Sequence, residues 1–304
     1  MKKLAAALLF ALLFPYIVTL AWTGTVEGNG SRGGSLGGRK ILLDRGTASA
    51  YMDMEEYLAG VLAAQIPAEY GEEALKAQAI VARTYICSRM GEEREIAESA
   101  LDIDCLEGKQ LAALWGEQAA ENYERLKEAA EATRGLVIAC DGALIEPLFH
   151  RASAGKTRNG GEGYPYLASV DCPEDQEAEG YLQAATLTKE EFAERIREIP
   201  EAGEVAAREL PGAVQILASD EAGYVSQIQI GTGTYTGEEV QYALGLASPC
   251  FSVEEYEGGL RVVTFGIGHG YGLSQYGAHR LSEEGWTAEE ILKFFYKNIA
   301  LISV

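Results

Sequence analysis

Apolar residues recur at helical spacing in two consecutive stretches near the start of the folded part of the chain. The first stretch follows Asp53, which with Glu56 fits a capping box, and it ends before Pro67. The second is predicted as a helix from Glu72 to Met90, in which Lys76 and Arg83 lie seven residues apart on one face. The apolar positions of the two stretches are Met54, Tyr57, Leu58, Val61, Leu62 and Ile66, then Leu75, Val81, Ala82, Tyr85 and Ile86.

The remaining pattern alternates between strands and helices without a βαβ rhythm. A short strand is predicted at 41–44, a helix at 119–133, and a hairpin at 136–150 around the Asp141-Gly142 turn. Three capping boxes predict helices after Thr188, Thr236 and Thr287, and strand-like runs lie at 214–218, 225–230 and 260–265. These elements predict an α+β fold, a single large mixed domain of interspersed helices and antiparallel hairpins with no internal repeat.

The N-terminus carries a long uncharged apolar run, residues 4–22, behind Lys2 and Lys3. Its length suits a bilayer, and the two lysines favour a cytoplasmic start. We therefore expect a signal-anchor transmembrane helix at 1–22, with a cleaved signal peptide as the alternative. A Gly/Ser-rich linker at 23–40 and a folded domain at 41–304, outside the cytoplasm, complete the predicted organisation.

The charge balance narrows the class of partner. The sequence has 46 acidic against 25 basic residues, a net charge of −21, which argues against nucleic acid and against adhesion to anionic lipid. It fits a neutral or amphoteric partner such as a glycan, but taken alone the charge is better explained by solubility. The five cysteines form no CxxC pair and match no zinc spacing, so no metal or other cofactor is predicted.

Two further segments contain residues suited to chemistry. Residues 149–167 leave a strand and enter a loop rich in Ser, Gly, Thr and Asn, and residues 265–296 carry alternating glycines before a helix. The glycines match neither GxGxxG nor a Walker loop, and Ser153 and Ser274 have no nucleophile-elbow context. For His150, His269 and His279, a structural or ligand hydrogen-bonding role is favoured over metal ligation.

Three long motifs, taken together, resemble the stage II sporulation protein D / LytB domain family. They read EYLAGVLAAQIPAEYGEEALKAQAIVARTYI, HRASAGKTRNGGEGYPYL and GHGYGLSQYGAHRLSEEGWTAEEILKFFY. The second motif typically reads hStSGGkT in the family, so the chain has SAG where many members have SGG. The resemblance extends from about 41 to 299.

The resemblance implies a role in the cell wall. The family's sporulation branch is described as membrane-anchored lytic transglycosylases. They cleave denuded peptidoglycan strands, those without stem peptides, during engulfment, and they act beside a partner amidase within a larger complex. The LytB branch is described as amidase enhancers. Zinc, which is described for some members, is not expected here, because no second histidine follows His150 closely and Cys172 is distant.

One departure from the family pattern concerns catalysis. Gln65 stands where the family has the glutamate of AAEMP. That carboxylic acid would protonate the glycosidic oxygen and then accept the proton of the C6 hydroxyl, and an amide does neither at neutral pH. Three hypotheses follow: a glycan-binding protein with weak or no activity, an active enzyme that uses another acid, or an interaction module of the LytB type. The nearby acids considered are Glu56, Glu69, Glu72 and Glu73.

The resemblance also implies a set of substrate-binding residues lining a glycan groove. For Gly270 and Gly272, a role in the fold alone is an equal alternative, and for Arg83 it is disfavoured because a buried charge needs a partner. The set is Lys76, Gln78, Arg83, Tyr85, His150, Ser153, Gly155, Thr157, His269, Gly270, Gly272, Ser274, Gln275 and Tyr276.

Overall fold

The computed structural model describes residues 38–44, 46 and 49–304. Residues 39–304 form one compact unit. Within these described ranges, no helix combines the length and the apolar character that crossing a bilayer requires. The predicted signal-anchor at 1–22 and most of the predicted linker lie outside the described residues.

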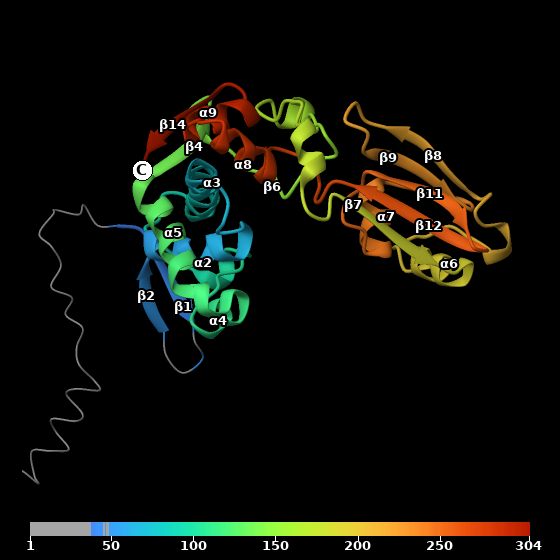
Figure 1. Cartoon of the computed structure of the whole chain (residues 1–304), viewed down its shortest axis with the longest axis horizontal. Helices are drawn as coiled ribbons and strands as arrows, with labels where there is room; N and C mark the ends of the chain where they lie inside the picture. The colour runs from blue at the N-terminus through green and yellow to red at the C-terminus, as the bar shows by residue number, and fades with distance from the viewer. Residues whose placement is uncertain (1–37, 45, 47–48) are drawn as a thin grey trace, which may run out of the picture. The chain divides into compact units, whose positions relative to one another are not determined.

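The N-terminal part of the described chain combines a small sheet with four helices. Strand β1 (Lys40–Asp44) pairs antiparallel with β2 (Ser49–Asp53) and parallel with β3 (Glu95–Ala97). Helices α2 (Met54–Gln65), α3 (Glu72–Met90) and α5 (Ala119–Ala132) pack against one another, as Figure 1 shows, and α4 (Lys109–Trp115) packs on α5. The predicted capping box before α2 is wrong. Asp53 accepts its bond from the amide of Glu55 rather than that of Glu56, because its short side chain turns toward the nearer amide.

Helix α3 is the central element, and it is buried on two sides rather than one. Leu75, Ala82 and Ile86 pack in the core formed with α2 and α5. Ile80 and Val81 pack in a second core with α8 (Gln275–Glu283) and α9 (Ala288–Phe295). The small alanines between these positions allow neighbouring helices to approach from both directions. The sequence pattern, read as a single apolar side, missed this second contact.

The predicted hairpin is shorter than its apolar pattern suggests. Strand β4 (Leu136–Cys140) turns at Asp141-Gly142, where both residues have positive φ, into the two-residue strand β5 (Ala143–Leu144). Pro147 follows, and proline cannot donate to a ladder. Strand β6 (Phe149–His150) therefore leaves β4 and pairs parallel with β13 (Leu273–Ser274). The other edge of β4 is covered by β14 (Ile299–Ser303).

Residues 182–265 build two antiparallel sheets around a third core. One sheet has the order β11 (Phe251–Tyr256), β12 (Gly259–Phe265), β7 (Leu182–Leu187). The other has the order β10 (Gly233–Tyr235), β9 (Val225–Ile230), β8 (Val214–Ser219). Helices α6 (Lys189–Arg197) and α7 (Gly237–Leu244) contribute Phe192 and Val240 to this core.

The other three predicted capping boxes are confirmed, at Thr188, Thr236 and Thr287. The predicted fold class is confirmed as a mixture of helices and mainly antiparallel sheets.

Candidate functional site

Gln65 is the last residue of α2 and the point at which the three sequence motifs meet. Its Oε1 accepts a hydrogen bond from Nε2 of Gln78 on α3 at 2.9 Å. Its backbone oxygen accepts one from Nε2 of Gln275 on α8, also at 2.9 Å. Gln78 and Gln275 are buried, whereas Gln65 is partly exposed. Gln78 thus holds the side chain of Gln65, and Gln275, 210 positions further along the chain, holds its backbone.

One cavity of about 330 Å³ is lined by Gln65. We call it the Gln65–His269 cavity. Tyr85 lines it, and the Tyr85 hydroxyl donates to the backbone oxygen of Leu101. The full lining is Gln65, Val81, Ala82, Tyr85, Asp102, Ile103, Glu146, Pro147, Leu148, Phe149 and His269. Two carboxylates therefore share the cavity with the Gln65 amide, and both belong to exposed loop residues that no sequence pattern singled out.

A second cavity of about 350 Å³ is also lined by Gln65. We call it the Trp115–Arg151 cavity. Its lining is Ala63, Ala64, Gln65, Ile66, Pro67, Glu69, Leu114, Trp115 and Arg151. Gln65 is the residue that the two cavities share. Of the acids considered from the sequence, Glu69 lines this cavity, while Glu72 and Glu73 are paired with Lys76.

Two of the motif histidines, His150 and His269, lie with their ring centres 5.9 Å apart, and burial lowers the pKa of both. His150 is fully buried, its Nδ1–H donates to the oxygen of Tyr271 at 3.1 Å, and its Nε2 has no partner among the described residues. Burial, helped by His269 nearby, lowers the His150 pKa to about 3. In His269, Nδ1 accepts from the amide of Tyr271 at 3.0 Å, and burial next to Arg158 lowers the pKa. Neither imidazole can supply a proton to a ligand at neutral pH.

Ser153 and Ser274 converge on a carboxylate that sequence reasoning missed. Asp175 is fully buried and accepts from the amide and the hydroxyl of Ser153 at 2.7 and 2.5 Å and from the hydroxyl of Ser274 at 2.8 Å. Burial raises the Asp175 pKa to about 6 in spite of these bonds. Ser274 also caps α8 by accepting from the amide of Gly277. Both hydroxyls thus tie motif segments together inside the protein.

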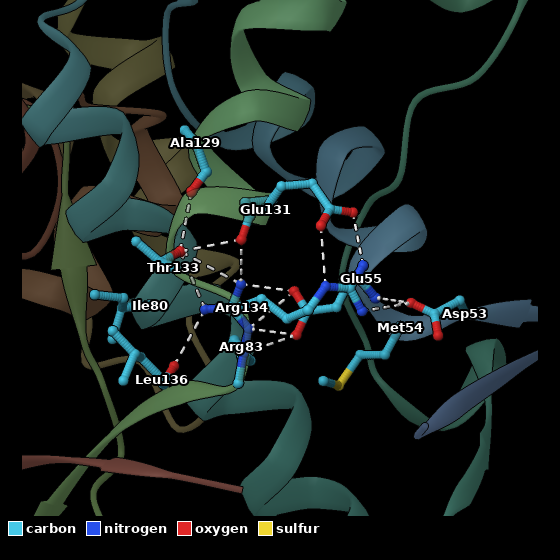
Figure 2. A network of polar contacts seen from close by, with 12 residues as sticks. Asp53, Met54, Glu55, Ile80, Arg83, Ala129, Glu131, Thr133, Arg134 and Leu136 are labelled. Carbon is cyan, nitrogen blue, oxygen red and sulfur yellow. Dashed lines mark hydrogen bonds and ion pairs between the residues drawn. The ribbon is translucent and has the colours of Figure 1, made fainter. Parts of the chain in front are cut away.

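Arg83 also faces inward, and Figure 2 shows its surroundings. The side chain is fully buried, and Nη2 lies 2.6 Å from Oε2 of Glu55. Other guanidinium hydrogens donate to Thr133 and to the backbone oxygens of Ala130 and Leu136. The partner that a buried charge requires is therefore Glu55, and the pair joins α2, α3 and α5. This arrangement gives Arg83 a place in the fold and no exposed atom for a ligand.

Gly270 and Gly272 have a steric reason to be glycine. Their φ angles are +81° and +71°, a region that other residues rarely adopt. A Cβ at Gly270 would overlap the ring of Tyr224, and one at Gly272 would overlap the backbone oxygen of Leu148. The fold alone therefore requires both glycines.

The remaining predicted residues lie in turns and helix contacts. Lys76 pairs with Glu72 and Glu73 on its own helix. Gly155 has a φ of +102°, and the hydroxyl of buried Thr157 accepts from the amide of Val170. The Tyr276 ring packs edge-on against Tyr70 and His279. None of these four predicted residues lines either cavity beside Gln65.

Arg158, within the second motif, organises the loop that carries His269. It is buried, and it lies 2.6 Å from carboxylate oxygens of both Asp220 and Glu238. Its guanidinium donates to the backbone oxygen of His269 and lies 4.4 Å from the ring centre of Tyr271. The only sequence signal for this role was that Arg158 is a basic residue within the loop of the second motif. Among the described residues, no group of three or more His, Cys, Asp or Glu could hold a metal ion.

Comparison with known proteins supports the motif resemblance. A family model described as Stage II sporulation protein matches residues 44–139. The stage II sporulation protein D of Bacillus amyloliquefaciens is 32% identical over 259 residues, which cover 81% of this chain and 73% of that protein. The protein of the same name from Bacillus subtilis is 31% identical over 260 residues, covering 80% and 73%.

A more distant relative is an amidase enhancer of Bacillus subtilis. It is 24% identical over 300 residues, covering 81% of this chain but 40% of that protein. The two sporulation proteins are the more similar relatives, and they match this chain over most of its length. The chain therefore belongs to the stage II sporulation protein D family.

Proposed function

We propose that this protein acts in sporulation by binding denuded peptidoglycan strands across Gln65, with weak or no lytic transglycosylase activity. Residues 4–22 would hold it in the cell membrane as a single-pass protein, with residues 41–304 outside the cytoplasm. Its partners would be glycan strands, a peptidoglycan amidase and the engulfment complex. Family membership supports the cell-wall role, and the two cavities that meet at Gln65 support an extended ligand.

The observation that carries the proposal is the carboxamide of Gln65, which lines both cavities. Cleavage of a glycosidic bond needs an acid to protonate the leaving oxygen and a base to accept a proton from the attacking hydroxyl. A carboxamide supplies neither, so rate assistance of about 10²–10⁴ is lost. The same amide, held through Oε1 by Gln78, still offers Nε2–H as a donor to a sugar oxygen.

The test compares the full-length chain with its Gln65→Glu variant on denuded glycan strands. Anhydro-ended products are counted by mass spectrometry, and strand binding is measured in parallel. The proposal expects both proteins to bind strands, and only the variant to release products at an appreciable rate. It fails if the natural chain binds no strand. Comparable cleavage by the natural chain would mean that another acid acts.

A second candidate, an active enzyme with a different acid, is favoured by Asp102 and Glu146 in the Gln65–His269 cavity. Asp102 has a φ of 50°, a conformation that functional sites often retain at some cost in stability. Under this alternative the natural chain cleaves strands, and Asp102→Asn or Glu146→Gln abolishes cleavage. Persistence of cleavage in both variants and in the double variant would exclude the two carboxylates.

The relative named as an amidase enhancer favours a third reading, an interaction module that no longer needs glycan. A pull-down of the full-length chain with denuded glycan strands discriminates between the readings. Retention on the strands supports glycan binding, and stimulation of an amidase without any strand retention would replace it.

A further inference from the structure

The Trp115–Arg151 cavity combines a cation with exposed apolar surface. Arg151 lines it directly after β6, and the charged end of the side chain lies 5.4 Å from the ring centre of Tyr70. Tyr70 is itself stacked on His279, with ring centres 4.5 Å apart. This packing fixes the guanidinium near the cavity wall.

The Arg151 guanidinium has no carboxylate within ion-pair distance among residues 38–44, 46 and 49–304. Glu69 lines the same cavity without approaching it that closely. In a chain with a net charge of −21, a partly buried arginine that faces a cavity and remains unpaired is available to an anionic ligand. Its planar group is suited to binding a carboxylate through two parallel hydrogen bonds.

Two differences from the family pattern change the local charge in the same direction. Gln65 replaces a glutamate, and Arg151 stands where the pattern hStSGGkT has serine. Both residues line the Trp115–Arg151 cavity. The first replaces an ionisable carboxyl group with an amide that cannot become negative, and the second adds a positive charge. The cavity of this chain is therefore more favourable to an anion than the family pattern implies.

The apolar part of the lining fits a sugar ring beside that anion. Leu114, 53% exposed, and Trp115 form the C-terminal end of α4 at the cavity. Aromatic and aliphatic side chains pack against the apolar faces of sugars, while a few polar groups set orientation. Hydrolysis of the amide bond that joins a stem peptide to its glycan leaves a carboxylate on the sugar substituent, where an uncharged amide stood before.

We propose that Arg151 binds this carboxylate and so makes the protein select strands from which the peptides have been removed. The sugar packs on Trp115, and Gln65 lies at the boundary with the next sugar position. This inference rests on the proposed glycan binding and adds a specificity-determining residue to it. The ligand class is an oligosaccharide that carries one carboxylate on every second sugar.

The experiment uses two probes that differ in whether the sugar substituent carries a carboxylate or an uncharged amide. One is denuded glycan strands with free carboxylates, and the other is the same strands after conversion of the carboxylates to methylamides. Dissociation constants are measured for the full-length chain, Arg151→Gln, Arg151→Lys and the control Arg261→Gln, which removes a partly exposed arginine on β12 paired with Glu254. Circular dichroism confirms that each variant is folded.

We expect the natural chain to bind the carboxylate strands about tenfold or more tightly than the methylamide strands, as a hydrogen bond to a charged group implies. Arg151→Gln should lose that difference by weakening only carboxylate binding, Arg151→Lys should keep part of it, and the control should keep all of it. Equal binding of both probes by the natural chain, or equal losses for both in Arg151→Gln, would refute this inference alone. Binding of neither probe would refute the proposed function as well.

Discussion

Gln78 donates from Nε2 to Oε1 of Gln65 over 2.9 Å, joining the middle of α3 to the last residue of α2. Gln78 is fully buried, and its own Oε1 has no hydrogen-bond partner among the described residues. The buried amide of Gln78 thus makes one side-chain hydrogen bond, to Gln65, the residue that lines both cavities. A buried acceptor without a partner lowers stability. Such an unpaired oxygen can persist where the residue has a task beyond folding.

We expect Gln78→Leu to weaken glycan binding more than it weakens the fold. The substitution removes one hydrogen bond, worth about 1 kcal/mol, and also removes the unpaired oxygen, so the free energy of unfolding should change by less than about 1 kcal/mol. Binding to denuded strands should weaken several-fold, because the Gln65 side chain loses its fixed orientation. Urea titration and strand binding measure the two effects. Unchanged binding, or a much larger loss of stability, would contradict the role given to Gln78.

Arg83 should be a stability residue rather than a binding residue. Arg83→Met leaves Glu55 as an unpaired buried charge, and we expect a loss of about 3–5 kcal/mol in the free energy of unfolding. The neighbouring Arg134→Met is the matched control, since that exposed arginine pairs with Glu131 and should change stability by about 0.5 kcal/mol at most. Urea denaturation measures the stability loss of both variants. Equal losses would contradict the view that the buried arginine stabilises the fold more than the exposed one.

The elements that the sequence predicted well are those determined by local signals. Helix α3 has its predicted bounds. The three capping boxes form because each N-cap threonine and its glutamate partner lie only three residues apart. Two parallel pairings, β1 with β3 and β6 with β13, had no local signal. They depend on contacts between distant segments, which periodicity does not encode.

The candidate site shows the same division. The motif resemblance identified Gln65, and the structure places it on two cavities. It did not reveal that Arg83 and Ser153 turn inward, because a motif records which residues occur together and not which way they point. Asp102 lies outside the three motifs, so only the three-dimensional arrangement identifies it. Arg151 lies within the second motif, but its position on a cavity beside Gln65 is visible only in the structure.

Asp175 joins the second and third motifs, and its protonation should be visible in the stability of the fold. Its ordinary pKa of 3.8 is raised to about 6, chiefly by burial. The folded state therefore holds a proton that the unfolded state has already released between about pH 4 and pH 6. In that window the free energy of unfolding decreases as the pH rises, and above it the contribution of Asp175 is constant.

Asp175→Asn cannot release that proton, so the difference in stability between the natural chain and this variant should itself depend on pH. We expect the natural chain to lose about 2 kcal/mol relative to the variant between pH 4 and pH 7, since each pKa unit corresponds to about 1.4 kcal/mol and this window spans most of the transition. Urea midpoints at several pH values measure the difference, in which the titration of the other acids cancels. The control Glu177→Gln removes an exposed carboxylate from the same turn and should differ from the natural chain by a constant amount. A difference for Asp175→Asn that stays constant, or that changes in the opposite direction, would mean that Asp175 is ionised throughout and that its three hydrogen bonds outweigh its burial.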